Sequence, residues 1–496
     1  MIRFSAISTK QRRRSYMKKS RILALFLALM MALTTTASAV SVKSGTTKVM
    51  LDSKQLQAES YEIEGYNYFK LRDLLSALDI GVTFDAATNT AVIDPSAHYK
   101  ASKTELLVGN WAPETRAAIQ KVIDRNANKG KYVVFDFDNT TVINDVEEAL
   151  LVYQIENLVF AIKPEELYDV LKTQIPDMNA AVGKNAAGQD VSCEQLAQDI
   201  VSDYKWLYAN YKGLAGSKSL DEIHKSNQYL DFAAKLRYMY SAVGDTFDAS
   251  VSYPWVTYLF AGMTPEEVRK LAGDSHRYWT SYGEFTEETW TSPAAAPGKA
   301  GVISTSYLTG ITFTDEVVDL YQTLMANGID VYVCSASFID VILAAACDEY
   351  FGLNVPEDQV YAMQLKLKDG RYIAEYNYDF GGKGMYAQTQ AAGKSTVIRN
   401  FILPKYNGAG PVMVFGDSAG DFNMMTDFPE TELGVIFNRY RKTSDPIQAL
   451  SVKAAETIGA ENPEYVLQGR DNNIGQLLPT QYSRMLGSDE LVLVRK

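Results

Sequence analysis

The sequence is poor in cysteine. Its 496 residues include three copies, Cys193, Cys334 and Cys347. Three cysteines cannot all pair, and two of them lie in apolar stretches that suit buried free thiols. We therefore expect no disulfide framework.

Long apolar runs are also missing. The run at residues 22–33 falls short of the roughly 20 residues that span a bilayer. Basic residues precede it and Ala37-Ser38-Ala39 follows it, so we expect an export signal over residues 1–39, with cleavage after Ala39. An uncleaved anchor helix is the alternative, and Met17 is an alternative start. No cysteine follows the cleavage site, which argues against a lipid anchor, and no other stretch is apolar enough to be a transmembrane segment.

Positive charge is scarce beyond the leader. Residues 1–39 carry eight Lys and Arg and no acid, so the remainder has 60 acidic and 40 basic residues, a net charge of −20. Such a surface repels nucleic acid and anionic lipid. We expect no nucleic-acid partner.

The length and the patterning predict more than one domain. Apolar residues make up 47% and charged residues 22% of the chain, as in globular proteins. Residues 47–95 look like a separate unit in which TKVMLDSKQLQ alternates as a strand, YNYFKLRDLLSAL is helical and GVTFDAATNTAVI is a hairpin closed at Asp85–Asn89. The stretch YFKLRDLLSALDIGVTFDAATNTAVI resembles the copper amine oxidase-like N-terminal domain of exported bacterial proteins. Copper sites use imidazole, and none of the three histidines lies within residues 47–95. We interpret residues 40–98 as a stalk that contacts the cell wall or another protein.

The rest of the chain alternates between helices and apolar strands. This pattern predicts an α/β fold, a Rossmann-like parallel sheet covered by helices on both faces. A mostly helical, aromatic-rich segment at about residues 145–301 interrupts it after the first strand, and TSPAAAPGKAG looks like the linker that returns to the sheet. We interpret the insertion as a cap within a domain at residues 105–496. The helices are expected at 111–128, 314–327, 338–350 and 394–403, the strands at 329–334 and 411–415, and a hairpin at 360–376.

The most informative stretch is VVFDFDNTTV, residues 133–142. An apolar run too short for anything but a buried strand ends in Asp136 and Asp138. Open α/β sheets keep their chemistry at the carboxyl ends of the strands, so one carboxylate can act as a nucleophile while the other handles protons. An Asp-Asn turn without chemistry is the alternative.

Two further segments supply a hydroxyl and a cation. The strand at residues 331–334 leads into Ser335-Ala336-Ser337, which offers a donor to an anionic oxygen at the same edge. Lys394, in AAGKSTVIRNFI, opens a helix and can neutralise a phosphate and an attacking carboxylate together. The GKST tetrapeptide is not a Walker loop, because position 388 is Gln. Lys383 in FGGKGMY is the competing lysine.

A second pair of acids follows the strand at residues 412–415. Asp417 ends the strand and Asp421 lies four residues later. Two carboxylates in this position suit Mg²⁺, a hard ion that takes oxygen ligands. An Asp helix cap is the alternative.

These segments occur in the order that is typical of the haloacid dehalogenase superfamily. FDFDNTTVINDVEEALL, VCSAS, GKSTVI and FGDSAGDFNMM resemble its phosphoserine phosphatase-like branch, and WAPETRAAIQKVID and QGRDN resemble the exported bacterial phosphorylcholine phosphatases. The resemblance implies a secreted or cell-wall-associated bacterial phosphatase. In it, Asp136 is the nucleophile and Asp138 the acid and base. Phosphate is held by Thr140, Ser335, Ala336 and Lys394, and Mg²⁺ by Asp136, Asp138 through its carbonyl, Asp417 and Asp421, which alternatively orients Lys394.

The substrate is left open among three hypotheses. The aromatic cap and the acids Asp145, Glu147 and Glu148 favour a cationic leaving group such as choline, although aromatic stripes often only pack, and the place of Asp145 matches a substrate-contacting acid of the phosphoserine branch. The first hypothesis is therefore a Mg²⁺-dependent phosphomonoesterase acting on phosphocholine or a similar amino-alcohol phosphate. The second is a phosphatase for phosphoserine or a broad range of small esters, and the third a wall-associated binding protein without catalysis.

Overall fold

The computed structural model describes residues 42–44, 48–51, 54–56, 60–63, 65–71, 74–75, 78, 80–85, 90–95, 105–382 and 384–495. The expected leader and Lys383 lie outside these residues. The chain divides into two compact units, residues 1–102 and 103–496. All three cysteines are free, as expected. Among the described residues, no helix combines the length and the apolar character needed to cross a bilayer.

The first unit consists of short antiparallel strands. A three-stranded sheet has the order β1-β4-β5, and β2-β3 and β6-β7 are hairpins. The expected hairpin is present, with Asp85 paired to Thr90. The expected single strand at 47–57 is instead the hairpin β2-β3. The expected helix was wrong at its start, because aromatic YNYF pairs with β4 as a strand. The strands are β1 (Val42–Ser44), β2 (Val49–Leu51), β3 (Lys54–Leu56), β4 (Ser60–Ile63), β5 (Tyr66–Phe69), β6 (Gly81–Asp85) and β7 (Thr90–Asp94).

The second unit is built on a six-stranded parallel sheet, which confirms the predicted fold class. The strand order is β14-β13-β8-β17-β18-β19, and the neighbouring strands pair in parallel. Side chains alternate along β8: Val133 and Phe135 join one apolar cluster, and Tyr132 and Val134 join another. Both faces of the sheet are therefore covered, which explains its continuous apolar strands. The strands are β8 (Lys131–Phe135), β13 (Ile329–Phe338), β14 (Val360–Met363), β17 (Met413–Gly416), β18 (Leu433–Phe437) and β19 (Tyr465–Gln468).

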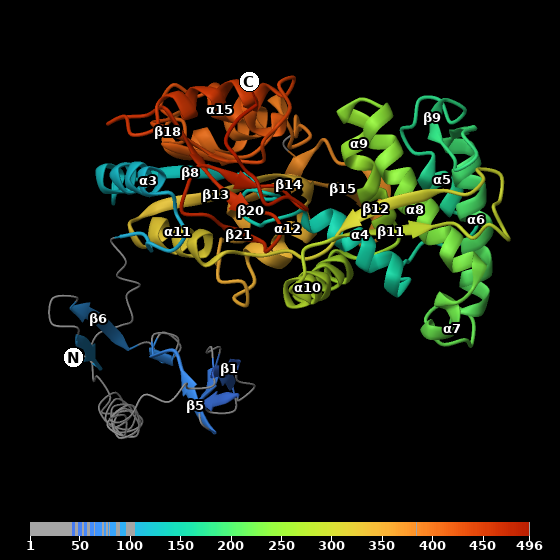
Figure 1. Cartoon of the computed structure of the whole chain (residues 1–496), viewed down its shortest axis with the longest axis horizontal. Coiled ribbons are helices and arrows are strands. Elements are labelled where there is room, and N and C mark those ends of the chain that lie inside the picture. The colour runs from blue at the N-terminus through green and yellow to red at the C-terminus, as the bar shows by residue number, and fades with distance from the viewer. Residues whose placement is uncertain are drawn as a thin grey trace, which may run out of the picture. The chain divides into compact units, whose positions relative to one another are not determined.

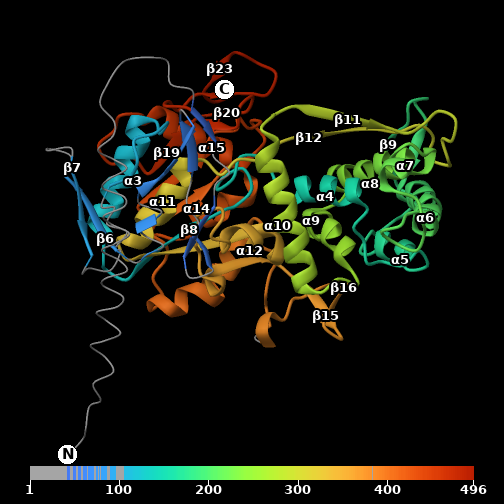
Figure 2. The same ribbon diagram turned by 90° about the horizontal axis from the view of Figure 1, so that it is seen from below.

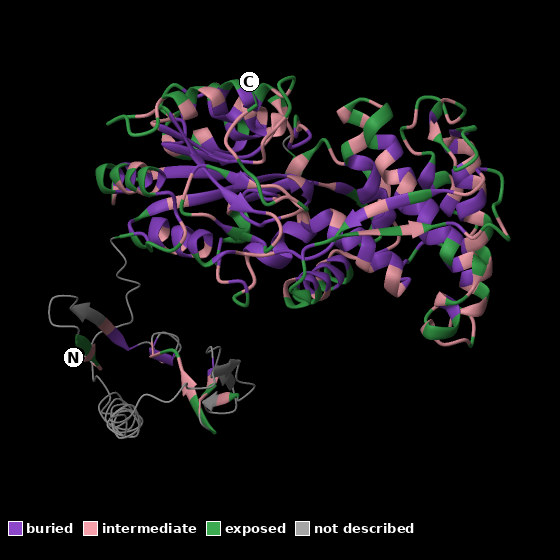
Figure 3. Ribbon diagram, viewed as in Figure 1, coloured by how far each residue is buried: buried purple, intermediate pink, exposed green. Residues whose placement is uncertain are grey.

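Helices form a layer on each face of this sheet (Figures 1 and 3). The apolar side chains of α3, α11 and α12 belong to the cluster of Phe135, and those of α13, α14 and α15 to the cluster of Val134. The helices are α3 (Pro113–Asn126), α11 (Asp315–Ala326), α12 (Ile339–Ala346), α13 (Ala392–Val397), α14 (Phe422–Thr426) and α15 (Pro446–Glu456), with the π-helix η4 (Ile398–Ile402) and the 3-10 turns η2 (Glu357–Gln359), η3 (Phe380–Gly382), η5 (Leu403–Tyr406) and η6 (Ala419–Asp421).

The predicted hairpin at residues 360–376 was wrong in its first half. The four residues of β14 are all buried and pair in parallel with β13, so they form an edge strand of the central sheet. The hairpin itself is β15 (Leu365–Lys368) with β16 (Arg371–Tyr376), and it turns at Asp369-Gly370 as expected.

The cap lies to one side of the sheet and is mostly helical (Figures 1 and 2). The segment TSPAAAPGKAG, expected as the return linker, instead joins β11 to β12 in a long hairpin. The chain returns to the sheet only near Thr312, which pairs with Ile143. The elements are α4 (Val146–Asn157), α5 (Leu167–Leu171), β9 (Ala181–Lys184), β10 (Asp190–Ser192), α6 (Cys193–Asn210), α7 (Leu220–His224), α8 (Asn227–Thr246), α9 (Ala249–Trp255), η1 (Val256–Phe260), α10 (Pro265–Tyr282), β11 (Glu287–Thr291) and β12 (Ser304–Leu308).

A small four-stranded sheet closes the chain after β19. Its order is β21-β20-β22-β23. Ser483 of this sheet donates a hydrogen bond from its hydroxyl to the carbonyl of Asn438, so the sheet is tied to the segment that follows β18. The strands are β20 (Arg470–Asp471), β21 (Gln476–Leu477), β22 (Ser483–Arg484) and β23 (Leu491–Val492).

Candidate active site

The first catalytic acid follows the central strand β8. The amide of Asp136 donates to the carbonyl of Phe415 at 2.9 Å, which continues the pairing of β8 with β17. The hydroxyl of Thr141 donates to the carbonyl of Asp136 at 2.7 Å. The backbone of Asp136 is therefore fixed on both sides, at the carboxyl edge of the sheet.

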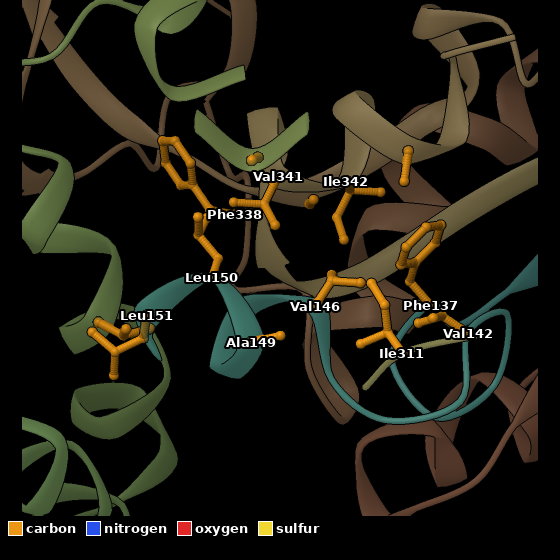
Figure 4. Close-up of a cluster of buried hydrophobic side chains, with 14 of the residues drawn as sticks. Phe137, Val142, Val146, Ala149, Leu150, Leu151, Ile311, Phe338, Val341 and Ile342 are labelled. Atoms are coloured by element: carbon orange, nitrogen blue, oxygen red, sulfur yellow. The ribbon is translucent and has the colours of Figure 1, made fainter. Parts of the chain in front are cut away.

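The loop after Asp136 turns sharply toward the cap. The amides of Thr140, Thr141 and Val142 donate to the carbonyl of Phe137, and Asn139 has a left-handed φ of 62°. Asn is among the residues that tolerate this conformation. Figure 4 shows the apolar side chains of this loop packed with those of the first cap helix and of α12, which holds the loop in place.

Asp138 is held by two donors. Its Oδ1 accepts from the amide of Val146 at 2.7 Å, and its Oδ2 accepts from the hydroxyl of Ser337 at 2.6 Å. Burial raises the pKa of Asp138 to about 7, against the lowering effect of Ser337. A carboxyl group with this pKa can give and take a proton near neutral pH.

Lys394 bridges two of the acids. Its Nζ donates to Oδ1 of Asp136 at 2.5 Å and to Oδ1 of Asp421 at 2.7 Å. Its side chain is 2% exposed. Burial would lower the pKa of Lys394, but the two carboxylates outweigh it and raise the pKa. The lysine therefore stays charged.

Asp417 and Asp421 follow strand β17, beside Asp136. Oδ2 of Asp421 accepts from the amides of Asp417 at 2.9 Å and Ser418 at 3.1 Å, so it caps the turn while its other oxygen binds Lys394. Oδ2 of Asp417 pairs with Nη1 of Arg439 at 2.7 Å. Burial would raise the pKa of Asp417, but Arg439 and two neighbouring arginines outweigh it and lower the pKa.

The donor set fits a hard divalent cation. Asp136, Asp417 and Asp421 each offer a carboxylate oxygen, and these oxygens lie within 4.8 Å of one another. Burial and the neighbouring Asp421 raise the pKa of Asp136 well above its ordinary range, although Lys394 opposes this. Lys394 therefore does not fully offset the charge around Asp136, and a further cation is needed to keep this carboxylate ionised. Oxygen ligands of this kind are those that Mg²⁺ prefers.

The expected phosphate-binding residues lie around this cluster. The hydroxyl of Thr140 donates to Asp136 at 3.1 Å and to Asp417 at 3.2 Å. Ser335 is buried, and its Oγ accepts from the amide of Ser337 at 3.1 Å. Ala336 lies between them on β13, which neighbours β8 in the sheet. It is Ser337 that contacts a catalytic acid, and the phosphate-binding roles of Ser335 and Ala336 stay predictions.

The acids after the first motif have mainly structural contacts. Asp145 caps α4: its Oδ1 accepts from the amides of Glu147 and Glu148, both at 2.9 Å. Glu147 is buried, and its Oε1 accepts from the amide of Phe338 at 3.3 Å. Glu148 is partly exposed and lies 3.7 Å from Arg237. The predicted substrate contact of Asp145 therefore has to come from its second oxygen.

Most cap aromatics pack against one another, as the alternative interpretation held. Tyr204, Trp255 and Trp279 are buried in the apolar core. Tyr253 on α9 differs, because 41% of the residue is exposed. Burial raises the pKa of Tyr253, while Lys394 lowers it and Asp421 raises it by smaller amounts. This tyrosine therefore lies near the catalytic groups.

Sequence reasoning missed three polar residues of the site. Ser337 was quoted without a role, and Arg470, in the QGRDN segment, donates to the carbonyl and the side-chain oxygen of Asn139, both at 3.0 Å. Arg439 was not singled out. It follows strand β18, which neighbours β17, so its place at the same sheet edge was the available signal.

Comparisons with known proteins show what this chain is similar to. No family model matches the sequence. The chain is 25% identical over 391 residues to phosphorylcholine phosphatase from Pseudomonas aeruginosa, covering 74% of this chain and 91% of that protein. A solved structure of a conserved protein of unknown function from Anaerococcus prevotii is 32% identical, covers 77% of this chain and 99% of its own, and has a TM-score of 0.70. A phosphoserine phosphohydrolase-like protein from Francisella tularensis is 13% identical, covers 62% of this chain and 87% of its own, and has a TM-score of 0.25.

Proposed function

The chain belongs to the same family as the Anaerococcus prevotii protein, and we propose that it is an exported, Mg²⁺-dependent phosphomonoesterase that acts through an aspartyl-phosphate. It is a phosphoric monoester hydrolase, related at 25% identity to a phosphorylcholine phosphatase. The observation that carries the mechanism is Lys394, buried between Asp136 and Asp421 beside Asp417. Charge neutralisation is the main task when a carboxylate attacks an anionic phosphate.

The first half of the reaction forms a covalent intermediate on Asp136. A carboxylate oxygen of Asp136 attacks the phosphorus, the bond to the leaving oxygen breaks, and Asp138 donates a proton to that oxygen. The pKa of Asp138, raised to about 7 by burial, lets part of the molecules hold this proton at neutral pH. Ser337 keeps the carboxyl oriented.

The second half hydrolyses the intermediate. Asp138, now ionised, takes a proton from water, which attacks the phosphorus and releases phosphate and free Asp136. Lys394 and Thr140 contact Asp136 and are positioned to offset charge on the phosphate.

Mg²⁺ would be held by Asp136, Asp417 and Asp421, with the carbonyl of Asp138 as a further proposed ligand. When bound, the ion supplies positive charge that polarises phosphoryl oxygens. Arg439 restrains Asp417 from the outer side of this set.

Phosphocholine or a similar amino-alcohol phosphate is the substrate we propose. Two observations support it: Tyr253 lies near the catalytic groups, and Asp145 and Glu148 place carboxylates beside Tyr240. Ring faces and carboxylates together suit a quaternary ammonium.

Arg237 favours the second hypothesis, a phosphatase for phosphoserine or a range of small esters. Its guanidinium lies 5.3 Å from the centre of the Tyr240 ring and is 3.7 Å from Glu148. The guanidinium of Arg237 therefore already covers the Tyr240 ring that choline would need. The same guanidinium can bind the carboxylate of phosphoserine. A binding protein without catalysis is less well supported, because clustered buried carboxylates are costly to keep.

A panel of phosphate monoesters, assayed with and without Mg²⁺, tests the function. We expect hydrolysis that requires Mg²⁺, and a preference for phosphocholine over glycerol phosphate of about tenfold to hundredfold, since a desolvated cation–π contact contributes ~2 kcal/mol. Free choline should compete. Equal turnover of both esters without inhibition by choline would replace the phosphocholine proposal with the second hypothesis, and no hydrolysis of any ester would overturn both.

A further inference from the structure

A cavity lies beside the catalytic loops, on the side of the C-terminal segment. It encloses about 660 Å³ and is lined by the base of the long cap hairpin, by the segment after β18 and by the last residues of the chain. Asn139 and Ala419, which belong to the two catalytic loops, form part of its wall. A cavity of this size holds a small organic ligand.

The wall of this cavity has many more basic than acidic side chains. Arg439, Arg441, Lys442, Arg470 and Arg495 line it. The same wall has one carboxylate, Asp445, in a chain whose overall net charge is −12. Positive charge is therefore concentrated here against the trend of the molecule.

Only part of this charge is neutralised. Arg441 pairs with Asp445 at 2.7 Å, and Arg439 pairs with Asp417 at 2.7 Å. Within the described part of the chain, the three remaining cations form no ion pair with a carboxylate. They are Lys442, Arg470 and Arg495.

Arg470 is the least compensated of these cations. It is 2% exposed, and its Nε has no hydrogen-bond partner among the described residues. Its other donors bind the neutral Asn139. Burial and the nearby Arg439 lower the pKa of Arg470 to about 9, and the carboxylate of Asp417 offsets this only in part. A buried guanidinium without a direct ion pair is costly, and an anion in the adjoining cavity would offset this cost.

We propose that this cavity is a second anion site that binds a phosphate group. Guanidinium groups match the geometry of phosphate oxygens, and the wall supplies four of them with a lysine at the rim. The phosphate can be inorganic phosphate or a second phosphate group carried by a larger ester. Phosphate binding in the cavity does not depend on the proposed function. The effect of this binding on kinetics rests on the proposed function.

The cavity is coupled to the catalytic centre through Arg439. This side chain lines the cavity and also binds Asp417. An anion in the cavity competes with Asp417 for the same guanidinium, so occupancy changes the electrostatics of the carboxylate cluster.

The test compares two double variants of the full chain. Lys442→Gln/Arg495→Gln removes two exposed cations of the cavity and none of the catalytic contacts. Lys453→Gln/Arg399→Gln removes two cations that lie outside the cavity wall and pair with Glu464 and Asp427. Calorimetric titration of inorganic phosphate, with Mg²⁺ present, should show one binding site fewer, or about tenfold weaker binding at one site, in the first variant than in the wild type and the control.

A kinetic comparison identifies the source of the phosphate. If a bisphosphate ester loses about tenfold in kcat/KM relative to a monophosphate ester in the cavity variant alone, the second phosphate of a substrate occupies the cavity. If calorimetry changes and this ratio does not, the occupant is free phosphate. Equal phosphate binding in all three proteins overturns the proposal, and an enzyme that hydrolyses no ester leaves the calorimetric result unaffected.

Discussion

Buried carboxylates of the same type have different properties in this site. Burial raises the pKa of Asp138 to about 7, whereas Arg439 and its neighbours overcome burial and lower the pKa of Asp417. The first residue is thus suited to exchange a proton, and the second to remain an anion that binds a cation. The proposed roles follow from these surroundings, because the two side chains are chemically identical.

Replacement of Asp138 by Asn should impair turnover severely. The amide keeps the shape of the side chain but cannot give or take the proton, so kcat should fall by a factor of ~10²–10⁴. Steady-state kinetics on a phosphate ester measure the effect. Asp427→Asn, a change at a partly exposed ion pair, is the matched control. An Asp138→Asn enzyme as fast as this control would remove Asp138 from the mechanism.

The sequence allowed the catalytic acids to be predicted, because each follows an apolar strand and parallel strands end at one edge. The partners of these acids were harder to predict. Ser337, which donates to Asp138, lies where the pairing of β13 with β14 shifts between Cys334 and Phe338, and a register shift cannot be predicted from residue spacing. Arg439 was missed because a single arginine after a strand is common.

At the level of elements, His276 joins a cap helix to a core helix. It lies on α10, and its Nε2 is 2.9 Å from the carbonyl of Val341 on α12. A carbonyl only accepts, so Nε2 carries the proton. Nδ1 has no partner within the described residues. Burial lowers the pKa of His276 to about 4, and the neutral ring is the form that fits this helix pair.

The stability of the chain should therefore decrease in mild acid. The unfolded histidine takes up a proton near its ordinary pKa of about 6.5, whereas the folded one resists down to about 4. The contribution of neutral His276 to the free energy of unfolding is complete above pH 6.5 and is lost as the pH falls toward 4. At pH 5 the free energy of unfolding should be lower by roughly 2 kcal/mol. His276→Gln keeps a donor and removes the titration, so urea unfolding of this variant should vary less between pH 7.5 and 5. Identical pH dependence of both proteins would contradict the assignment.

The tip of the cap hairpin is held by a buried lysine. Nζ of Lys235 donates to Asp199 at 2.8 Å, to Asp231 at 2.7 Å and to the carbonyl of Pro297 at 2.9 Å. Asp199 in turn accepts from the amide of Lys299 at 2.8 Å. The ion pairs and the hairpin therefore depend on each other.

Lys235→Met should destabilise the protein strongly. It leaves two buried carboxylates without their cation, which costs about 3–5 kcal/mol of unfolding free energy. Lys172→Met, at an exposed pair with Asp169, should cost less than about 1 kcal/mol. Urea denaturation of both variants gives the comparison, and equal losses would show that the buried cluster does not anchor the hairpin.

On the scale of the whole molecule, the alternation of helices and apolar strands was enough to predict the parallel sheet and its helical cover. The errors fell where local pattern and tertiary pairing disagree. TSPAAAPGKAG has the composition of a linker, but its role as a hairpin tip depends on the distant Lys235 and Asp199. In the same way, the local pattern of YNYF also fits a helix, and it is the pairing with β4 that makes this segment a strand.

The first unit should contribute little to catalysis. No group of acids, histidines or cysteines that could hold a metal lies among its described residues, so we expect deletion of residues 40–98 to leave kcat and KM nearly unchanged and to alter retention at the cell surface. Kinetics and cell fractionation of the truncated and untruncated proteins measure both. A large loss of turnover per folded molecule would mean that this unit takes part in the active site.

The central claim is that Asp136 is the nucleophile, and the variant Asp136→Asn tests it most directly. Wild-type protein and variant are assayed for phosphate release with Mg²⁺ and then quenched in acid, and their peptides are searched for phosphate on residue 136. The wild type should release phosphate and carry it transiently on Asp136, while the variant should do neither and should show the same urea unfolding transitions as the wild type. Phosphate release by Asp136→Asn at the wild-type rate would contradict the account.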